Sequence, residues 1–101
     1  MNLSVQCRNA PRHSRLKQVI VDCAAHAFKH FEEELTLVAI STTRDGRLHA
    51  ASVIASSIHG PRIATNARDE QPMAAVREAI QRATDILHRR RGKRRSFRRA
   101  A

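Results

Sequence analysis

The basic residues close to the C-terminal end have the types and spacing that most clearly predict chemistry. The stretch from Arg89 to Arg99 holds eight Lys or Arg residues and no Asp or Glu. The chain carries a formal net charge of +10, and residues 1–88 contribute little of it, with 11 Lys or Arg against 9 Asp or Glu. Such a concentration of positive charge predicts contacts to the phosphates of a polyanion, and favours nucleic acid over a membrane surface.

The segment before this basic run has the apolar spacing of a helix. Apolar residues recur at spacings of three and four over residues 73–87, and Pro72, preceded by two acids, fits the first turn. At 100° per residue, Arg82 and Arg89 lie within about 20° of each other and point about 140 to 160° away from the apolar stripe. We therefore expect these two arginines to form an ordered contact surface. Gly92 is a natural end for the helix.

The predicted RNA-binding residues come from both helical segments of the chain. The final helix and its end contribute Arg77, Arg82, Arg89, Arg90 and Lys93, and the start of the first helix contributes Arg15 and Lys17. Lys93 joins the surface if the helix continues past Gly92. The charge pattern divides the chain into a domain of residues 1–91 and a basic, flexible tail of residues 92–101.

The aromatic content limits how nucleic acid can be bound. The chain has three Phe and no Trp or Tyr, and Phe28 and Phe31 fall on the apolar stripe of the first helix. Proteins that read single strands on a sheet need exposed aromatic rings for base stacking. We therefore expect phosphate contact and shape recognition by Arg and Lys instead.

The sequence predicts no enzyme. It contains no nucleophile motif and only three glycines, so it has no glycine-rich phosphate loop, and we expect no cofactor and no small-molecule substrate. His26 and His30 have the spacing of two ligands on one helix face, but no accompanying acid motif predicts a metal site. Cys7 and Cys23 match no zinc pattern and are expected to be reduced.

The chain has no run of about 18 apolar residues, and its first residues do not resemble an export signal. We expect a soluble, cytoplasmic protein without a membrane partner.

The expected fold class is α+β, in the element order β-α-β-β-β-α. Residues 2–7 alternate with Leu3, Val5 and Cys7 on one face. A helix is expected from about Ser14, its N-cap, to Phe31, with Val19 on its apolar stripe. Strands over residues 35–43 and 47–57 flank the hairpin signal Asp45-Gly46, and a shorter strand covers residues 62–67, with Ile63, Thr65 and Ala67 on one face. The simplest arrangement is one four-stranded mixed sheet with two helices packed on one face, in which the first strand pairs in parallel with a neighbour.

These residues resemble the short, single-domain form of the ribosome hibernation promoting factors, also called ribosome-associated inhibitors or sigma-54 modulation proteins. The resemblance covers nearly the whole chain. It rests on the element order, on the strand NLSVQC followed by APRHSRLKQVI, and above all on ATNARDEQPMAAVREAIQRATDILHRRRGK. The family implies a fold similar to double-stranded RNA-binding domains and a position in the small ribosomal subunit, on its rRNA, where transfer and messenger RNA would pass.

The resemblance implies that the protein silences ribosomes in stationary or stressed cells. The basic helix positions of the family fall on Arg82, Arg89 and Lys93. One usually basic position is Asp85 here, which weakens that contact, and the usual aromatic residue near the helix start is Met73. The second domain that mediates ribosome pairing in long members has no counterpart in this sequence, and weak self-association is allowed.

Two other functions remain open at this stage. A general RNA-binding or constitutive ribosomal protein would also be small and basic with a charged tail. Alternatively, the weakly charged sheet face, with Thr36, Ser41, Ser52 and Ser56, would bind a protein and modulate transcription, as one of the family names suggests.

Overall fold

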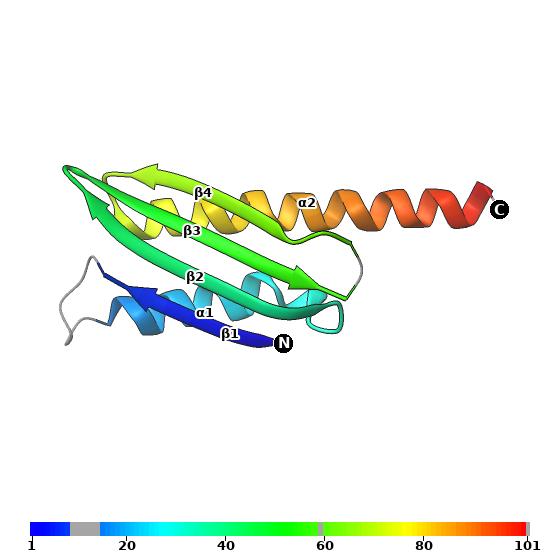
Figure 1. Ribbon diagram of the computed structural model, residues 1–101, viewed down its shortest axis with the longest axis horizontal. Coiled ribbons are helices and arrows are strands. Elements are labelled where there is room, and N and C mark those ends of the chain that lie inside the picture. Colours follow the sequence, from blue (N-terminus) through cyan, green and yellow to red (C-terminus); the bar gives the residue numbers. More distant parts are fainter. Residues whose placement is uncertain (9–14, 59, 101) are drawn as a thin grey trace.

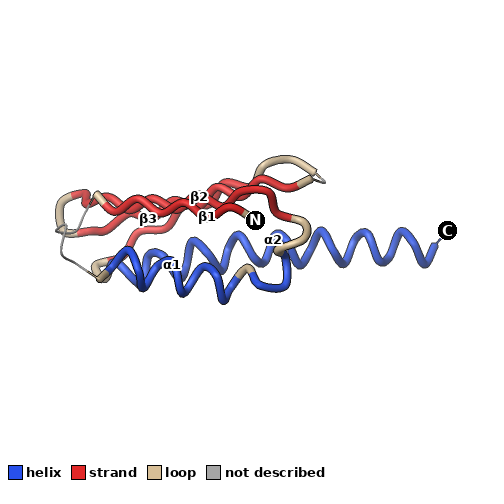
Figure 2. Tube along the Cα trace, turned by 90° about the horizontal axis from the view of Figure 1, so that it is seen from below, coloured by secondary structure: helices blue, strands red, loops and turns tan. Residues whose placement is uncertain are grey.

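The chain folds as one sheet covered on one face by two helices (Figures 1 and 2). The computed structural model describes residues 1–8, 15–58 and 60–100, and the side chains of these residues up to Gly92. The elements, in order, are β1 (Asn2–Cys7), α1 (Leu16–Ala27), a short 3-10 helix η1 (Lys29–Phe31), β2 (Leu35–Asp45), β3 (Leu48–Ser57), β4 (Ile63–Asp69) and α2 (Pro72–Ala100). This order confirms the predicted α+β fold.

The sheet has the strand order β1-β2-β3-β4 and is mixed. β1 pairs in parallel with β2, as expected for two strands joined through a helix, and the other two pairings are antiparallel. The β2–β3 hairpin closes through Gly46 and Arg47, since Asp45 pairs with Leu48, and Gly46 adopts a positive φ of 65°. A register shift between Leu35 and Leu37 bends β2 at its start.

The core lies between the sheet and the helices because every strand alternates. In β4, Ile63, Thr65 and Ala67 are buried while the residues between them are exposed, as the sequence predicted. α2 packs on β3 and β4, and α1 packs beside β1. The Thr65 hydroxyl donates a 2.7 Å hydrogen bond to the carbonyl oxygen of Ala79, which ties β4 to α2. The other face of the sheet is open to solvent.

The first helix is shorter than its apolar pattern predicted. α1 ends at Ala27, and η1 carries Phe31 into the core, where both Phe28 and Phe31 are buried. Val19 lies in the predicted stripe but is 44% exposed. The residue at the N-cap position is Arg15, without a side-chain capping bond. The expected cap, Ser14, lies outside the described residues.

The second helix is longer than predicted. α2 continues through Gly92 to Ala100, so the expected end at Gly92 is wrong. Gly92 has no positive φ, and a Cβ built on it meets no atom within 4 Å. A glycine in right-handed helical conformation does not terminate a helix; it only lowers its stability. The helix therefore projects well beyond the end of the sheet (Figure 2). The division into a domain of residues 1–91 and a flexible tail stays a prediction.

Candidate nucleic-acid interface

One flank of α2, beside β4, brings Arg82 and Arg89 together. Both side chains are exposed, and both line a shallow depression of about 540 Å³ between the helix and the strand. The rest of its lining is Ala64, Thr65, Asn66, Asp85 and Ile86. The helix pattern correctly paired the two arginines. Asp85 lies in the same lining, between the two arginines in the sequence, and its negative charge lowers the positive potential of the depression.

Arg82 is fixed by two bonds on this flank. Its guanidinium donates to the backbone carbonyl oxygen of Asn66 on β4 and to Glu78 Oε1, at 2.7 Å for the latter. The carbonyl group lies on an edge strand, so Arg82 covers part of the sheet edge. The side chain is still 54% exposed, which leaves donors available to a ligand.

Arg89 is less constrained than Arg82. Its Nε lies 3.5 Å from the carbonyl oxygen of Asp85, which is at the limit of a hydrogen bond. An exposed guanidinium held this loosely can turn towards a phosphate without losing a strong partner. Of the two arginines on this flank, Arg89 is therefore the freer to turn towards a ligand.

Arg90 turns towards the protein, although the sequence predicted it as an RNA contact. Its Nη1 donates a 2.8 Å hydrogen bond to the carbonyl oxygen of Pro61 in the β3–β4 connection. The same nitrogen would lie 3.3 Å from a Cβ at Gly60, which has a φ of +95°. Arg90 thus ties the β3–β4 connection to α2. The prediction that it binds RNA is not tested by this contact.

Arg91 also faces the protein, on the side of α2 next to η1. Its Nε lies 2.7 Å from Glu34 Oε1, and its guanidinium carbon lies 4.3 Å from the centroid of the Phe31 ring. The guanidinium also donates to the carbonyl oxygen of His30. The edge-to-face contact between Phe31 and His88, with centroids 5.0 Å apart, completes this cluster. Two of the arginines that begin the basic run therefore hold α2 in place.

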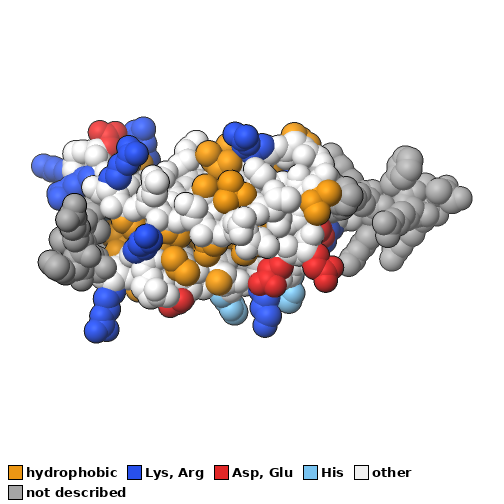
Figure 3. Space-filling model, turned by 60° about the horizontal axis from the view of Figure 1, so that its bottom comes forward, with side chains coloured by type: hydrophobic (Ala, Val, Ile, Leu, Met, Phe, Trp, Pro, Cys, Tyr) orange, Lys and Arg blue, Asp and Glu red, His pale blue; other side chains and the backbone are white. Residues whose placement is uncertain are grey.

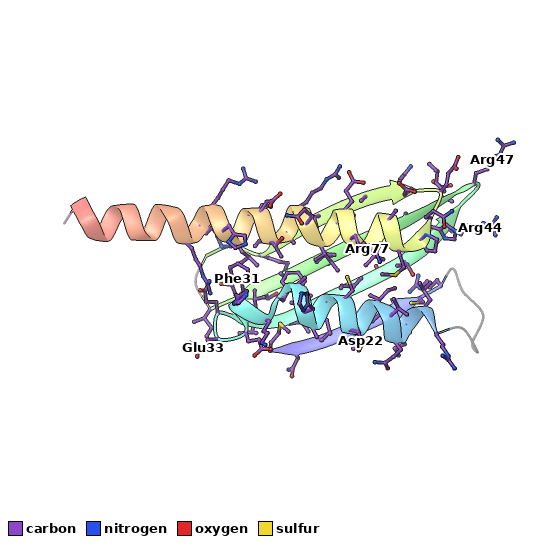
Figure 4. The ribbon with its side chains drawn as sticks, turned by 180° about the vertical axis from the view of Figure 1, so that it is seen from behind. Asp22, Phe31, Glu33, Arg44, Arg47 and Arg77 are labelled. Atoms are coloured by element: carbon purple, nitrogen blue, oxygen red, sulfur yellow. The ribbon has the colours of Figure 1, made fainter. Side chains whose placement is uncertain are left out.

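The other predicted residues lie away from the β4 flank. Arg77 is exposed on the side of α2 that faces α1 (Figure 4). Arg15 and Lys17 are exposed at the start of α1, which lies at the same end of the molecule as the β2–β3 hairpin. The side chain of Lys93 lies outside the described residues. A continuous helix places position 93 about 20° from Arg82 and about 40° from Arg89.

Basic residues also gather at the hairpin end, where the sequence predicted no contact surface. Arg44 and Arg47 are exposed there (Figure 4), and Arg68 on β4 lies beside them, 3.5 Å from Asp45. The space-filling view shows Lys and Arg side chains gathered at this end (Figure 3). These residues come from three separate elements and have no common sequence period, so only the pairing of the strands could have revealed them.

The part of the chain that the structure describes shows no metal-binding cluster, no bond between its cysteines and no membrane-spanning helix. No group of three or more His, Cys, Asp or Glu residues there could hold a metal ion. Cys7 and Cys23 are half-buried and unbonded to each other. Within the same residues, no helix is both long enough and apolar enough to span a bilayer.

The fold is shared with solved structures of two proteins. A ribosomal subunit interface protein from Coxiella burnetii aligns with a TM-score of 0.75 and 11% identity, over 91% of this chain and 99% of that one. The N-terminal domain of Thermus thermophilus Protein Y aligns with a TM-score of 0.73 and 18% identity, over 88% of this chain and 98% of that one. No family model matches the sequence, and no curated protein sequence matches it. At these identities the likeness establishes the fold.

Proposed function

We propose that this chain is a ribosome-binding factor of the hibernation promoting family, which occupies the decoding region of the small subunit through contacts between α2 and rRNA phosphates. The fold likeness to a protein named for the ribosomal subunit interface supports a ribosomal partner. The resemblance of the sequence to the same kind of protein points in the same direction. In this proposal the chain works in the cytoplasm and silences translation under stress.

The observation that carries the proposal is the continuity of α2. Because the helix runs to Ala100 without ending at Gly92, the flank that presents Arg82 and Arg89 continues into the basic run. A helix of 29 residues is about 43 Å long. Its outer part extends beyond the sheet, where RNA can approach it from several sides (Figure 2). Phosphates along an RNA groove would then meet a row of cations at helical spacing.

The test is sedimentation with purified small ribosomal subunits at low and moderate salt. The full chain should pellet with the subunits, and Arg89→Glu should weaken this binding about tenfold or more, because the variant loses a phosphate contact and adds repulsion. Arg77→Glu is the matched variant, since it makes the same charge change on the other flank of the same helix. We expect a smaller loss from it.

Three results would count against the proposal. A wild-type chain that stays in the supernatant at low salt would remove the ribosomal partner. Equal losses from Arg89→Glu and Arg77→Glu would show that net charge, and not the β4 flank, governs binding. A protein that is equally abundant in growing and starved cells would favour a constitutive ribosomal or general RNA-binding protein over a hibernation factor.

A further inference from the structure

Two depressions on the surface share one residue, Asn66. The first is the depression beside α2 that Arg82 and Arg89 line. The second has a volume of about 410 Å³ and lies on the open face of the sheet. Its polar lining is Ser41, Thr43, Ser52, Asn66 and Arg68, and three alanines complete it. Because Asn66 lies on the edge strand β4, the two depressions meet where the sheet ends.

The open-face depression is built on a row of polar side chains that crosses the whole sheet. Gln6 pairs with Ser41, Ser41 with Ser52, and Ser52 with Asn66, so the four residues are in register on four adjacent strands. Neighbouring strands lie about 4.8 Å apart, so the row is about 14 Å wide. Each side chain can both donate and accept hydrogen bonds.

Positive charge lies next to this row on the hairpin side. Arg68 follows Asn66 by two residues on β4 and therefore shares its face of the sheet. Arg8 is exposed at the end of β1, and its backbone nitrogen donates to Thr42 on β2. The ion pair of Arg68 with Asp45 is 3.5 Å long, with side chains 65% and 68% exposed. Such an exposed pair is weak, so a phosphate can replace the carboxylate at little cost.

A polar open face is common in sheets that meet water, but this one has features that water alone does not require. Its side chains are small enough to leave a depression, and its hydroxyl and amide groups are in register beside an arginine. Phe28 and Phe31 are buried, so among the described residues no phenylalanine ring is available for base stacking. Hydroxyl and amide groups beside a cation suit the ribose 2′-hydroxyls and phosphates of RNA.

We infer that the open sheet face is a second RNA-binding surface, on which Ser52 and Asn66 contact ribose hydroxyls and Arg68 contacts a phosphate of a strand that also meets Arg82 and Arg89. The inference rests on the proposed function for its choice of RNA as the partner. The strand passes from the flank of α2 over the edge at Asn66 and onto the open face. Arg82 supports this path because it holds the backbone of Asn66 in place.

The experiment measures binding of the full chain to a fluorescent 20-nucleotide RNA and to DNA of the same sequence, beside sedimentation with small subunits. Removing Arg68 with Arg68→Ala should weaken binding to both oligonucleotides about fivefold and lower the salt slope by about 0.7 to 0.9. The double variant Ser52→Ala/Asn66→Ala should weaken RNA binding about fivefold and DNA binding less, because DNA lacks the 2′-hydroxyl. Asn66→Ala keeps the carbonyl group that Arg82 binds.

Arg62→Ala is the matched control, because Arg62 is exposed just before the other end of β4, about 20 Å along the strand from Arg68. It should bind both oligonucleotides as the wild-type chain does. All variants change exposed or half-buried side chains and should unfold thermally as the wild type does, which a melting curve verifies.

The following results would overturn either the inference or the proposed function. Wild-type affinity for RNA in Arg68→Ala and in the double variant would overturn the inference, even if Arg89→Glu still loses the ribosome. If these variants bind the RNA oligonucleotide normally but sediment less with small subunits, the open face would contact a ribosomal protein. That result would also overturn the inference. Failure of the wild-type chain to sediment would overturn the proposed function alone, since the oligonucleotide measurement needs no ribosome.

Discussion

Arg91 and Glu34, 57 positions apart in the chain, form an ion pair in which Nε lies 2.7 Å from Oε1. The guanidinium also covers the face of Phe31, and the side chains of the pair are 30% and 21% exposed. Partial burial makes the pair stronger than an exposed one, and the ring adds a cation–π contact. Part of the basic run is therefore used to fasten the helix from which the rest of the run extends.

Replacement of this arginine should lower stability without touching the proposed RNA surfaces. We expect Arg91→Ala to reduce the free energy of unfolding by about 1 to 2 kcal/mol, because it removes the ion pair and the contact with Phe31. Urea unfolding followed by circular dichroism measures this. Arg89→Ala is the control and should change stability by less than about 0.5 kcal/mol. Equal effects of the two substitutions would contradict the role of Arg91.

Much of the fold could be predicted because it depends on local periodicity. The alternation of Leu3, Val5 and Cys7 and that of Ile63, Thr65 and Ala67 each identified a half-buried strand, and the structure places both sets towards the helices. The parallel pairing of β1 followed from the helix that connects it to β2. Hydrophobic burial acts on every second residue of a half-buried strand, so its signal repeats along the sequence.

The features that the sequence did not reveal concern single residues or contacts between distant ones. Gly92 is a typical helix terminator, but a glycine ends a helix only when it adopts a positive φ, and composition does not reveal φ. The inward turns of Arg90 and Arg91 depend on acceptors at Pro61 and Glu34, 29 and 57 positions away. The surface shared by Asn66 and Arg68 depends on strand register. None of these contacts leaves a periodic pattern in the sequence.

Replacement of Arg82 should lower both stability and RNA binding, whereas replacement of Arg89 should lower RNA binding alone. Arg82→Ala removes the donor to the Asn66 carbonyl group and the bond to Glu78, so we expect a loss of about 1 kcal/mol in unfolding free energy. Ribosome binding should fall about as much as in Arg89→Ala. Arg82→Lys tests the geometry, because a lysine keeps the charge but cannot hold both acceptors in a planar fork. Full stability in Arg82→Ala would show that the edge of β4 needs no such cover.

Removal of the residues after Gly92 should separate folding from binding. Among the side chains of α2 that the structure describes, Leu87 is the last buried one, and Arg91 is retained, so residues 1–92 should unfold within about 0.5 kcal/mol of the full chain. The truncated chain loses Lys93, Arg94, Arg95, Arg98 and Arg99. If each contacts a phosphate, the salt slope of RNA binding falls by about 4. An unchanged slope would show that these residues do not contact RNA, and a large loss of stability would contradict a domain that ends near residue 91.

Gly92→Ala tests whether α2 continues past the glycine in solution. Because the position is helical and nothing lies within 4 Å of the added Cβ, alanine should stabilise this part of the helix by about 0.5 to 1 kcal/mol. Circular dichroism at 222 nm should show higher helicity in the variant, and the difference should vanish in a chain that stops at residue 92. A glycine that ended the helix would instead adopt a positive φ, and alanine there would lower both helicity and stability. A more helical variant should also bind RNA more tightly, since less of the basic segment has to become ordered on binding.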